Sequence, residues 1–299
     1  MELPKKIFKG FVYLNIEHPL VAWECYRGAL ISSYKNASNQ VIDMSLFMAN
    51  KISSGDNINL ANELLFENVR LQYYPMVVSR LKCLYVFDNE HSAIAAQSWD
   101  EHFKSENLVE LGVGAYNDTK VDANWVTFAE RDKSGLIKSD YISSIKRYWS
   151  GEPYPNKTPH WEVLVEGYGI VWGIEHKQRA YQIIKEVMPK CLGLLEISRI
   201  AESMGFYLGH IFPHISRLSP SVYKLSYMMD MHELNDNYGA FIERLEQYKG
   251  PINYADAAQL FDEQKRLIIT AGDLREYEKN FSISQTNLHN YNGWKTHTI

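Results

Sequence analysis

The sequence lacks both a long apolar segment and a rich set of cysteines. None of its apolar runs approaches the roughly 18 residues that a transmembrane helix requires. Its three cysteines, Cys25, Cys83 and Cys191, are far apart and odd in number, which excludes a disulfide framework and a CxxC zinc site. Residues 1–6 lead into no long apolar stretch, so we expect no secretory signal. We therefore predict a cytoplasmic protein without a membrane partner.

The chain also lacks a strong excess of charge of either sign. The 299 residues include 31 Lys and Arg against 36 Asp and Glu, a formal net charge of −5 at pH 7. This balance lacks the basic footprint of a typical nucleic-acid-binding protein, although an enzyme needs only a local basic groove. The composition, with 45% hydrophobic and 22% charged residues, excludes a wholly disordered chain. Aromatic residues are plentiful instead, and a surplus of Tyr and Trp suits a pocket that stacks flat rings.

The pattern of apolar residues changes near residue 178. Before it, apolar runs bounded by Gly, Asn and Asp predict strands, which cover residues 7–16, 81–87, 108–113, 125–128 and 161–165. Helices are predicted between them over residues 57–71 and 92–103. After residue 178, segments separated by Pro and Gly predict helices over residues 180–187, 192–204, 222–234, 238–248 and 254–269. The last stretch, residues 282–299 with Tyr291, Trp294 and His297, is expected to be loose.

These patterns predict an α+β protein in two parts. Residues 1–178 would form an α+β catalytic domain, and residues 179–299 would form a helical accessory domain with a flexible tail. At roughly 100–200 residues per domain, the length of the chain agrees with this division.

The stretch most informative about function is residues 159–171. Glu162 stands at the head of an apolar strand, which we expect to end in a turn at Gly167 before a second apolar piece. The polar loop 150–159, with its three prolines and one glycine, precedes this strand. At such a junction the strand holds a carboxylate in place, and the loop can close over a ligand.

This pattern, Glu-Val-Leu-Val-x-Gly-x-x-x-Val from Glu162 onward, resembles the catalytic-glutamate strand of the toxin-type ADP-ribosyltransferases, which consume NAD. The resemblance implies a split, mostly antiparallel sheet with NAD as co-substrate in its cleft and no metal. It also implies that Glu162 stabilises the positive charge that develops on the sugar as nicotinamide leaves. Glu166, which precedes Gly167, is the weaker candidate for this role.

Two further stretches follow in the order of the same family. Residues 11–18 and 26–30 resemble the opening strand and helix of the DarT-like members, which modify nucleic acid. The family's first strand carries a His or Arg, where this chain has Leu14 or Asn15. Residues 73–87, running into 92–99, are similar to the family's second core strand and the helix after it. The resemblance implies an NAD site formed by Tyr13, Asn15, Tyr26, Ser79 and Arg80, in which the planar fork of Arg80 would bind phosphate.

The residues just before Glu162 bear on the acceptor. The family commonly has Glu or Gln two positions before the catalytic glutamate, whereas this chain has His160. An imidazole titrates near neutral pH, so His160 could deprotonate an acceptor amine or hydroxyl. Trp161 would meet the acceptor, and its ring could stack on an unpaired base.

The predicted function is transfer of ADP-ribose from NAD to a macromolecule, with nucleic acid favoured over protein. Such an enzyme would act as a toxin or phage-defence effector, with a neutralising antitoxin as its partner. The alternatives are an NAD glycohydrolase, a protein-modifying transferase and a non-enzymatic interaction module.

Each candidate residue also has a simpler structural interpretation. Glu162 could cap a strand edge, Arg80 could pair with a surface acid such as Asp88, and the two tyrosines could be packing residues. His210 and His214 have the spacing of zinc ligands on a helix, but Pro213 interrupts that helix, so we expect no metal site there. Cys83 is predicted to be a buried small apolar residue.

Overall fold

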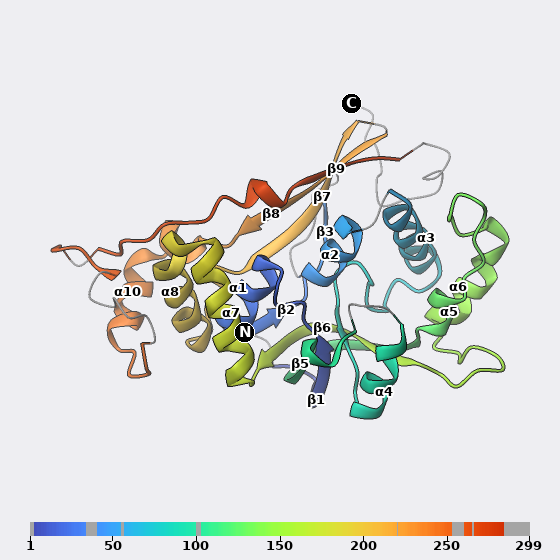
Figure 1. Ribbon diagram of the computed structural model, residues 1–299, viewed down its shortest axis with the longest axis horizontal. Coiled ribbons are helices and arrows are strands. Elements are labelled where there is room, and N and C mark those ends of the chain that lie inside the picture. The colour runs from blue at the N-terminus through green and yellow to red at the C-terminus, as the bar shows by residue number, and fades with distance from the viewer. Residues whose placement is uncertain are drawn as a thin grey trace.

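Two antiparallel sheets organise the computed structural model of the chain (Figure 1). The structure describes residues 3–33, 41–54, 57–99, 103–219, 221–252, 260–264 and 266–283. Most of the loose tail predicted from residue 282 onward, including Tyr291, Trp294 and His297, lies outside these residues. The mixture of helices and antiparallel strands confirms the α+β class.

The larger sheet contains the strand that carries Glu162. Its strands are β1 (Lys6–Tyr13), β5 (Leu108–Asp122), β6 (Trp161–Val171), β2 (Ala29–Ile31) and β4 (Leu84–Val86). The order is β1-β5-β6-β2, and β4 also pairs with β6. β4 pairs with residues 163–165 of β6 and β2 pairs with residues 168–170, so these two short strands occupy successive parts of one edge of β6.

The turn that we predicted at Gly167 does not form. Strand β6 continues through Gly167 and Gly169 to Val171, and all of it pairs with β5. A side chain at Gly167 would overlap the carbonyl oxygen of Gly114, beside a register shift between Ala115 and Asn117. Gly167 therefore permits the close approach of the neighbouring strand β5 and does not mark a turn.

The second sheet corrects the helical interpretation of the C-terminal part. It contains β3 (Val41–Asp43), β7 (Ile211–Ser219), β8 (Val222–Met229) and β9 (Lys279–Ser282), in that order. The predicted helix over residues 222–234 is therefore wrong, because β8 is followed only by the short helix α9 (His232–Asn235). Tyr223, Leu225 and Tyr227 are buried at alternate positions of β8, which is the period of a strand.

Two other segments differ from expectation. The strand predicted over residues 125–128 is the short helix α5 (Asn124–Thr127), whose first backbone N–H donates to the Asp122 carboxylate over 3.0 Å. In place of the helix predicted over residues 254–269, the described residues between 260 and 269 form no α-helix, and Phe261 bridges Leu267. Residues 253–259 lie outside the described part of the chain.

The remaining helices include most of those predicted. They are α1 (Pro19–Arg27), α2 (Leu46–Ser54), α3 (Asn57–Tyr73), α4 (Glu90–Ala95), α6 (Ile142–Trp149), α7 (Ile174–Val187), α8 (Leu192–Ser203) and α10 (Tyr238–Glu246). The helix predicted over residues 92–103 is shorter and ends in a 3-10 turn at Ala96–Ser98. None of the helices in the described residues is both long and apolar enough to span a membrane.

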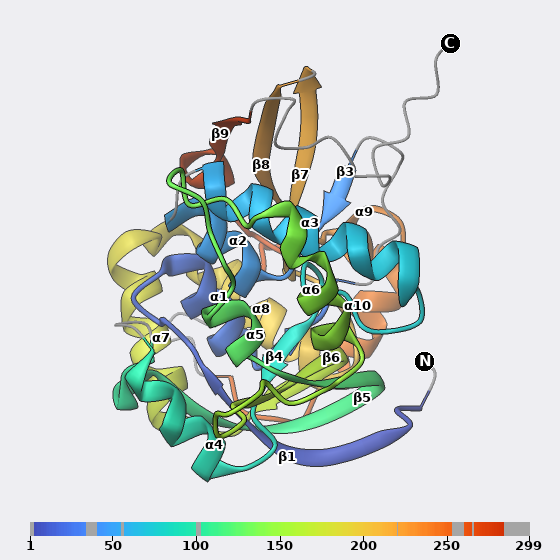
Figure 2. The same ribbon diagram turned by 90° about the vertical axis from the view of Figure 1, so that its right-hand side faces the viewer.

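The two halves of the chain are closely associated. In both views, helices α1 and α2 lie between the two sheets (Figures 1 and 2). Strand β3 from the N-terminal part pairs with β7 from the C-terminal part, and α1 packs on α7 and α8. Residue 178 falls within α7, and one apolar core extends from Val12 to Ile283. The division at residue 178 stays a prediction.

Candidate functional site

Glu162 is the second residue of β6, and its carboxylate opens into a cleft of about 560 Å³. Only 8% of the residue is exposed to solvent. Within the part of the chain that the structure describes, no group donates a hydrogen bond to this carboxylate or forms an ion pair with it. A buried carboxylate without such a partner is costly for the fold, and such groups are concentrated at functional sites.

Burial raises the pKa of Glu162 above its ordinary value of 4.5. The positive charges of Arg80 and Lys51 oppose this rise, whereas the negative charges of Glu63 and Asp122 add to it. The carboxylate thus lies in the field of two cations without touching either one. Its charge is left available to a bound ligand.

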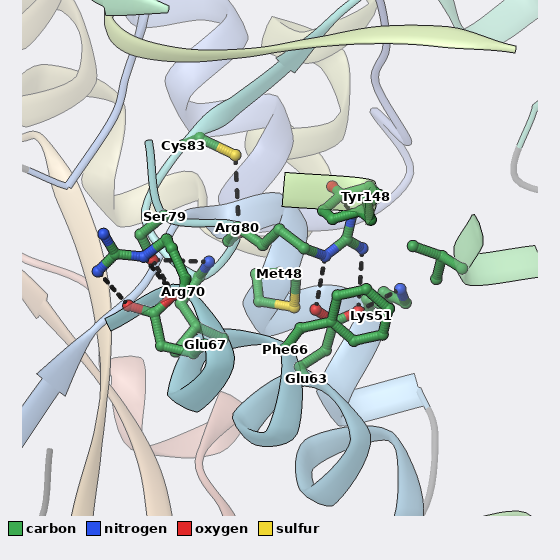
Figure 3. Close-up of polar contacts among 12 residues, drawn as sticks. Met48, Lys51, Glu63, Phe66, Glu67, Arg70, Ser79, Arg80, Cys83 and Tyr148 are labelled. Atoms are coloured by element: carbon green, nitrogen blue, oxygen red, sulfur yellow. Dashed lines mark hydrogen bonds and ion pairs between the residues drawn. The ribbon is translucent and has the colours of Figure 1, made fainter. Parts of the chain in front are cut away.

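Arg80 lies in the wall of the same cleft, in a fully partnered cluster (Figure 3). Its Nε and Nη2 donate to the two carboxylate oxygens of Glu63 over 2.9 and 3.1 Å, and its Nη1 donates to the Tyr148 hydroxyl over 2.6 Å. The guanidinium also lies 5.3–5.5 Å from the ring centres of Phe66, Tyr85 and Tyr148. Arg80 is 3% exposed, and each of its guanidinium nitrogens has a protein partner.

Glu63 of α3 compensates the buried charge of Arg80. Burial alone would raise the pKa of Glu63, but Arg80 and Lys51 hold it well below its usual range. The surface acid Asp88 pairs instead with Lys120 over 2.6 Å, so it is not the partner of Arg80. The Arg80 cluster therefore supports the wall of the cleft rather than offering a free cation to a phosphate.

A second, smaller pocket adjoins the cleft. It has a volume of about 70 Å³ and is lined by Tyr13, Leu14 and Asn15 from the end of β1 and the residues after it. Phe47 and Tyr85 line both pockets, and their ring centres are 4.6 Å apart. The structure thus brings the predicted Tyr13 and Asn15 beside the Glu162 cleft. The Tyr13 hydroxyl is already used, since it donates to the Ala93 carbonyl over 2.7 Å.

Two predicted NAD-binding residues lie outside both pockets. The Ser79 hydroxyl is buried and donates to the Glu67 carboxylate over 2.9 Å, as Figure 3 shows. The Tyr26 hydroxyl donates to Glu196 over 2.7 Å and lines a different cleft, between α1, α7 and α8. Both side chains therefore have structural partners, and the structure does not bring them to Glu162.

The residues before Glu162 are also arranged differently from expectation. The indole Nε1 of Trp99 donates to His160 Nδ1 over 3.1 Å. Because an indole nitrogen can only donate, Nδ1 must accept, and the proton of the neutral ring is on Nε2. Trp99 lines the cleft, whereas His160 and Trp161 are not among the residues of its wall. Successive side chains of a strand point to opposite faces, so Trp161 points away from Glu162 and lies under Lys120.

The remaining candidates have simple places in the fold. Glu166 is exposed and lines neither pocket. Cys83 is buried with a free thiol, as predicted. His214 lies on strand β7 rather than on a helix, and the described residues contain no group of side chains that could hold a metal ion.

Sequence reasoning missed the side chains that support the site. Glu63 and Glu67 lie one helical turn apart on α3, and both are buried, although charged residues rarely are. Two carboxylates among the apolar positions of a helix were a usable signal for buried arginine partners. Lys51 and Trp99 carried no comparable signal, because they lie far from Glu162 in the sequence.

Fold and site together define an α+β protein in whose aromatic cleft the buried Glu162 carboxylate has no hydrogen-bond partner among the described residues. The chain belongs to the family described as a protein of unknown function, DUF2441, whose model matches residues 8–179. The matched span contains Lys51, Glu63, Arg80 and Glu162, and it ends within α7. A search of curated proteins finds no match to the chain.

Proposed function

We propose that the protein is an ADP-ribosyltransferase that consumes NAD, with Glu162 as its catalytic carboxylate. The observation that carries this proposal is the buried Glu162 side chain, which faces a cleft and has no hydrogen-bond partner in the described residues. A carboxylate held in this way can stabilise a cation that exists only in the transition state.

The size of the cleft, about 560 Å³, and the walls of the site support a dinucleotide as the ligand. The cleft and the smaller pocket adjoin at Phe47, Asn50 and Tyr85, so a ligand in the cleft also meets the mouth of the smaller pocket. Aromatic side chains in both walls offer flat surfaces for the nicotinamide and adenine rings. The antiparallel sheet, with β2 and β4 sharing one edge of β6, agrees with the split sheet implied by the resemblance.

The proposed reaction breaks the bond between the ribose C1′ and the nicotinamide nitrogen. Nicotinamide leaves with the electron pair of that bond, and positive charge develops on the sugar ring. The ionised Glu162 stabilises this charge, and the effect is large because little water competes in the buried site. A nucleophile of the acceptor then bonds to C1′ and releases its proton.

For the acceptor, we propose a nucleic acid with unpaired bases. Trp99 and Phe103 line the cleft, and their ring centres are 5.0 Å apart in an edge-to-face arrangement. Aromatic side chains beside a reacting centre suit the stacking of an exposed base. Since Trp99 occupies His160 Nδ1, we assign His160 to positioning Trp99 rather than to proton transfer. A toxin or phage-defence role, with an antitoxin partner in the cytoplasm, remains the corresponding proposal.

The proposal is tested by incubating the protein and its Glu162→Gln variant with radiolabelled NAD and total cell extract. The products are then treated separately with nuclease and with protease. We expect label that is sensitive to nuclease and resistant to protease, and a loss of at least 100-fold in the variant. Label sensitive to protease would make proteins the acceptor, and free ADP-ribose alone would indicate a glycohydrolase. If neither protein consumes NAD, the enzymatic proposal fails and the interaction module replaces it.

A further inference from the structure

Among the residues that the structure describes, two cations line the Glu162 cleft, and of these Lys51 faces solvent. Arg80 has a partner for each guanidinium nitrogen, as described above. The Lys51 side chain, in the last turn of α2, is 35% exposed and lines the cleft. Its ammonium donates to Glu63 Oε1 over 2.7 Å. An ammonium has three N–H donors, and Glu63 is its one acceptor within residues 3–283 as far as they are described, so two donors are left to a ligand.

The pairing around Glu63 leaves Lys51 with a shared counter-ion at contact distance. One carboxylate, Glu63, is shared between Arg80 and Lys51 at contact distance. The second carboxylate that feels both cations, Glu162, touches neither of them. Since the guanidinium is enclosed by aromatic rings, the partly exposed ammonium of Lys51 is the cationic group that the cleft presents to a ligand. An anionic group that enters the cleft meets this ammonium first.

Asn50, the residue before Lys51, indicates which part of the cleft an anionic group of a ligand would occupy. Asn50 lines both the cleft and the smaller pocket, at their junction. A carboxamide supplies two N–H donors without charge, which suits the uncharged parts of a phosphate-bearing ligand or its phosphate oxygens. Lys51 and Asn50 therefore lie where a ligand in the cleft passes the mouth of the smaller pocket.

We propose that Lys51, with Asn50 beside it, binds the diphosphate of a dinucleotide, and that Arg80 acts only through Glu63 to hold Lys51 in place. The choice of NAD as the source of this diphosphate rests on the proposed function. The anion site is tested by binding alone, without turnover, so the anion site and the proposed reaction can fail separately.

The test measures the binding of ADP by calorimetry to the full chain and to two matched variants. Lys51→Met removes the ammonium that is proposed to bind the diphosphate, and Lys224→Met is the matched control. Lys224 is 34% exposed and pairs with Glu278 over 2.6 Å, so it resembles Lys51 in burial and in pairing but lies outside both pockets. We expect ADP to bind at least tenfold more weakly to Lys51→Met and with unchanged affinity to the control. Lys51→Arg should retain most of the affinity, since it keeps the charge.

A second measurement uses the unaltered protein and does not depend on the folding of a variant. Lysine side chains are acylated with and without ADP, and the modified positions are identified by mass spectrometry. ADP should protect Lys51 and leave Lys224 unprotected. Absence of ADP binding, or equal protection of both lysines, would overturn the inference. Binding of ADP through Lys51 without any consumption of NAD would keep the anion site and refute the proposed reaction.

Discussion

Glu63 and Glu162 are two buried glutamates that both feel the charge of Arg80, and they differ in what surrounds their carboxylates. Glu63 contacts two cations, and its pKa lies well below its usual range. Glu162 senses the same cations from a distance, and burial raises its pKa. Their exposures, 4% and 8%, are nearly equal. Burial alone therefore does not distinguish these two carboxylates, whereas their hydrogen-bond partners do.

The largest effect on stability is expected from Glu63→Gln. The substitution removes the negative charge that compensates Arg80 and leaves a cation buried among aromatic rings. Breaking a buried ion pair from one side destabilises a protein by about 3 kcal/mol. Denaturant unfolding at pH 7 measures this loss. Lys224→Met, which breaks a partly exposed pair, should cost less than about 1 kcal/mol. A loss for Glu63→Gln no greater than for this control would contradict the structural role of Glu63.

For Glu162→Gln we expect a change in stability of the opposite sign. Removing an unpartnered buried charge should stabilise the fold at pH 7 by on the order of 1 kcal/mol, while NAD consumption is lost. This gain of stability with loss of activity is the pattern of a residue kept for function. A destabilisation of similar size would show that Glu162 holds the fold together.

The pH dependence of stability separates the two glutamates further. Because the folded-state pKa of Glu162 is raised, stability falls as pH rises from about 4.5 to that pKa, and the advantage of Glu162→Gln grows over the same interval. Because the folded-state pKa of Glu63 is lowered, its contribution is present above 4.5 and is lost as pH falls towards that pKa. Unfolding curves of the wild type and both variants measure these slopes, between pH 4 and pH 8 for Glu162 and from pH 5 down to pH 2 for Glu63. If the stability of the two variants depended on pH in the same way, the proposed difference between Glu63 and Glu162 would be contradicted.

The smallest effect is expected from His160→Phe, which removes the acceptor of the Trp99 indole. The loss of this half-buried hydrogen bond should cost about 1 kcal/mol of stability or less. If His160 only positions Trp99, the variant should raise KM for the acceptor and leave the pH dependence of kcat unchanged. A lost limb in the pH profile of kcat would instead make His160 a proton-transfer residue.

Local patterns in the sequence predicted much of the fold. The 3.6-residue period of residues 57–71 and the apolar runs around Ile7 and Val163 led to α3, β1 and β6. The apolar pattern led to a wrong prediction where both the helical and the strand period fit the same segment. Residues 222–229 have apolar side chains at alternate positions, yet their mixture of Tyr, Leu and Met also suits a helix. Pairing with β7, which begins eleven residues earlier, decides for the strand.

The candidate site was predictable only in part. Glu162 was predicted because the strand beside it carries a recognisable pattern, and in the described part of the chain its carboxylate has no hydrogen-bond partner. The predicted phosphate role of Arg80 and the base role of His160 depended on side chains that no local pattern contains. Arg80 is bound by Glu63 from α3 and by Tyr148 from α6, and His160 is bound by Trp99.

The sequence by itself determined that the chain is α+β, that it has no long apolar segment, and that Glu162 stands at the start of an apolar strand. Only the tertiary structure decided which charges are paired and which remain open. The reason is that periodicity is a property of neighbouring residues, whereas the partner of a buried charge comes from another element of the fold. Arg80 and Glu63 are 17 positions apart and Arg80 and Tyr148 are 68 apart, and these contacts left Lys51 and Glu162 facing the cleft.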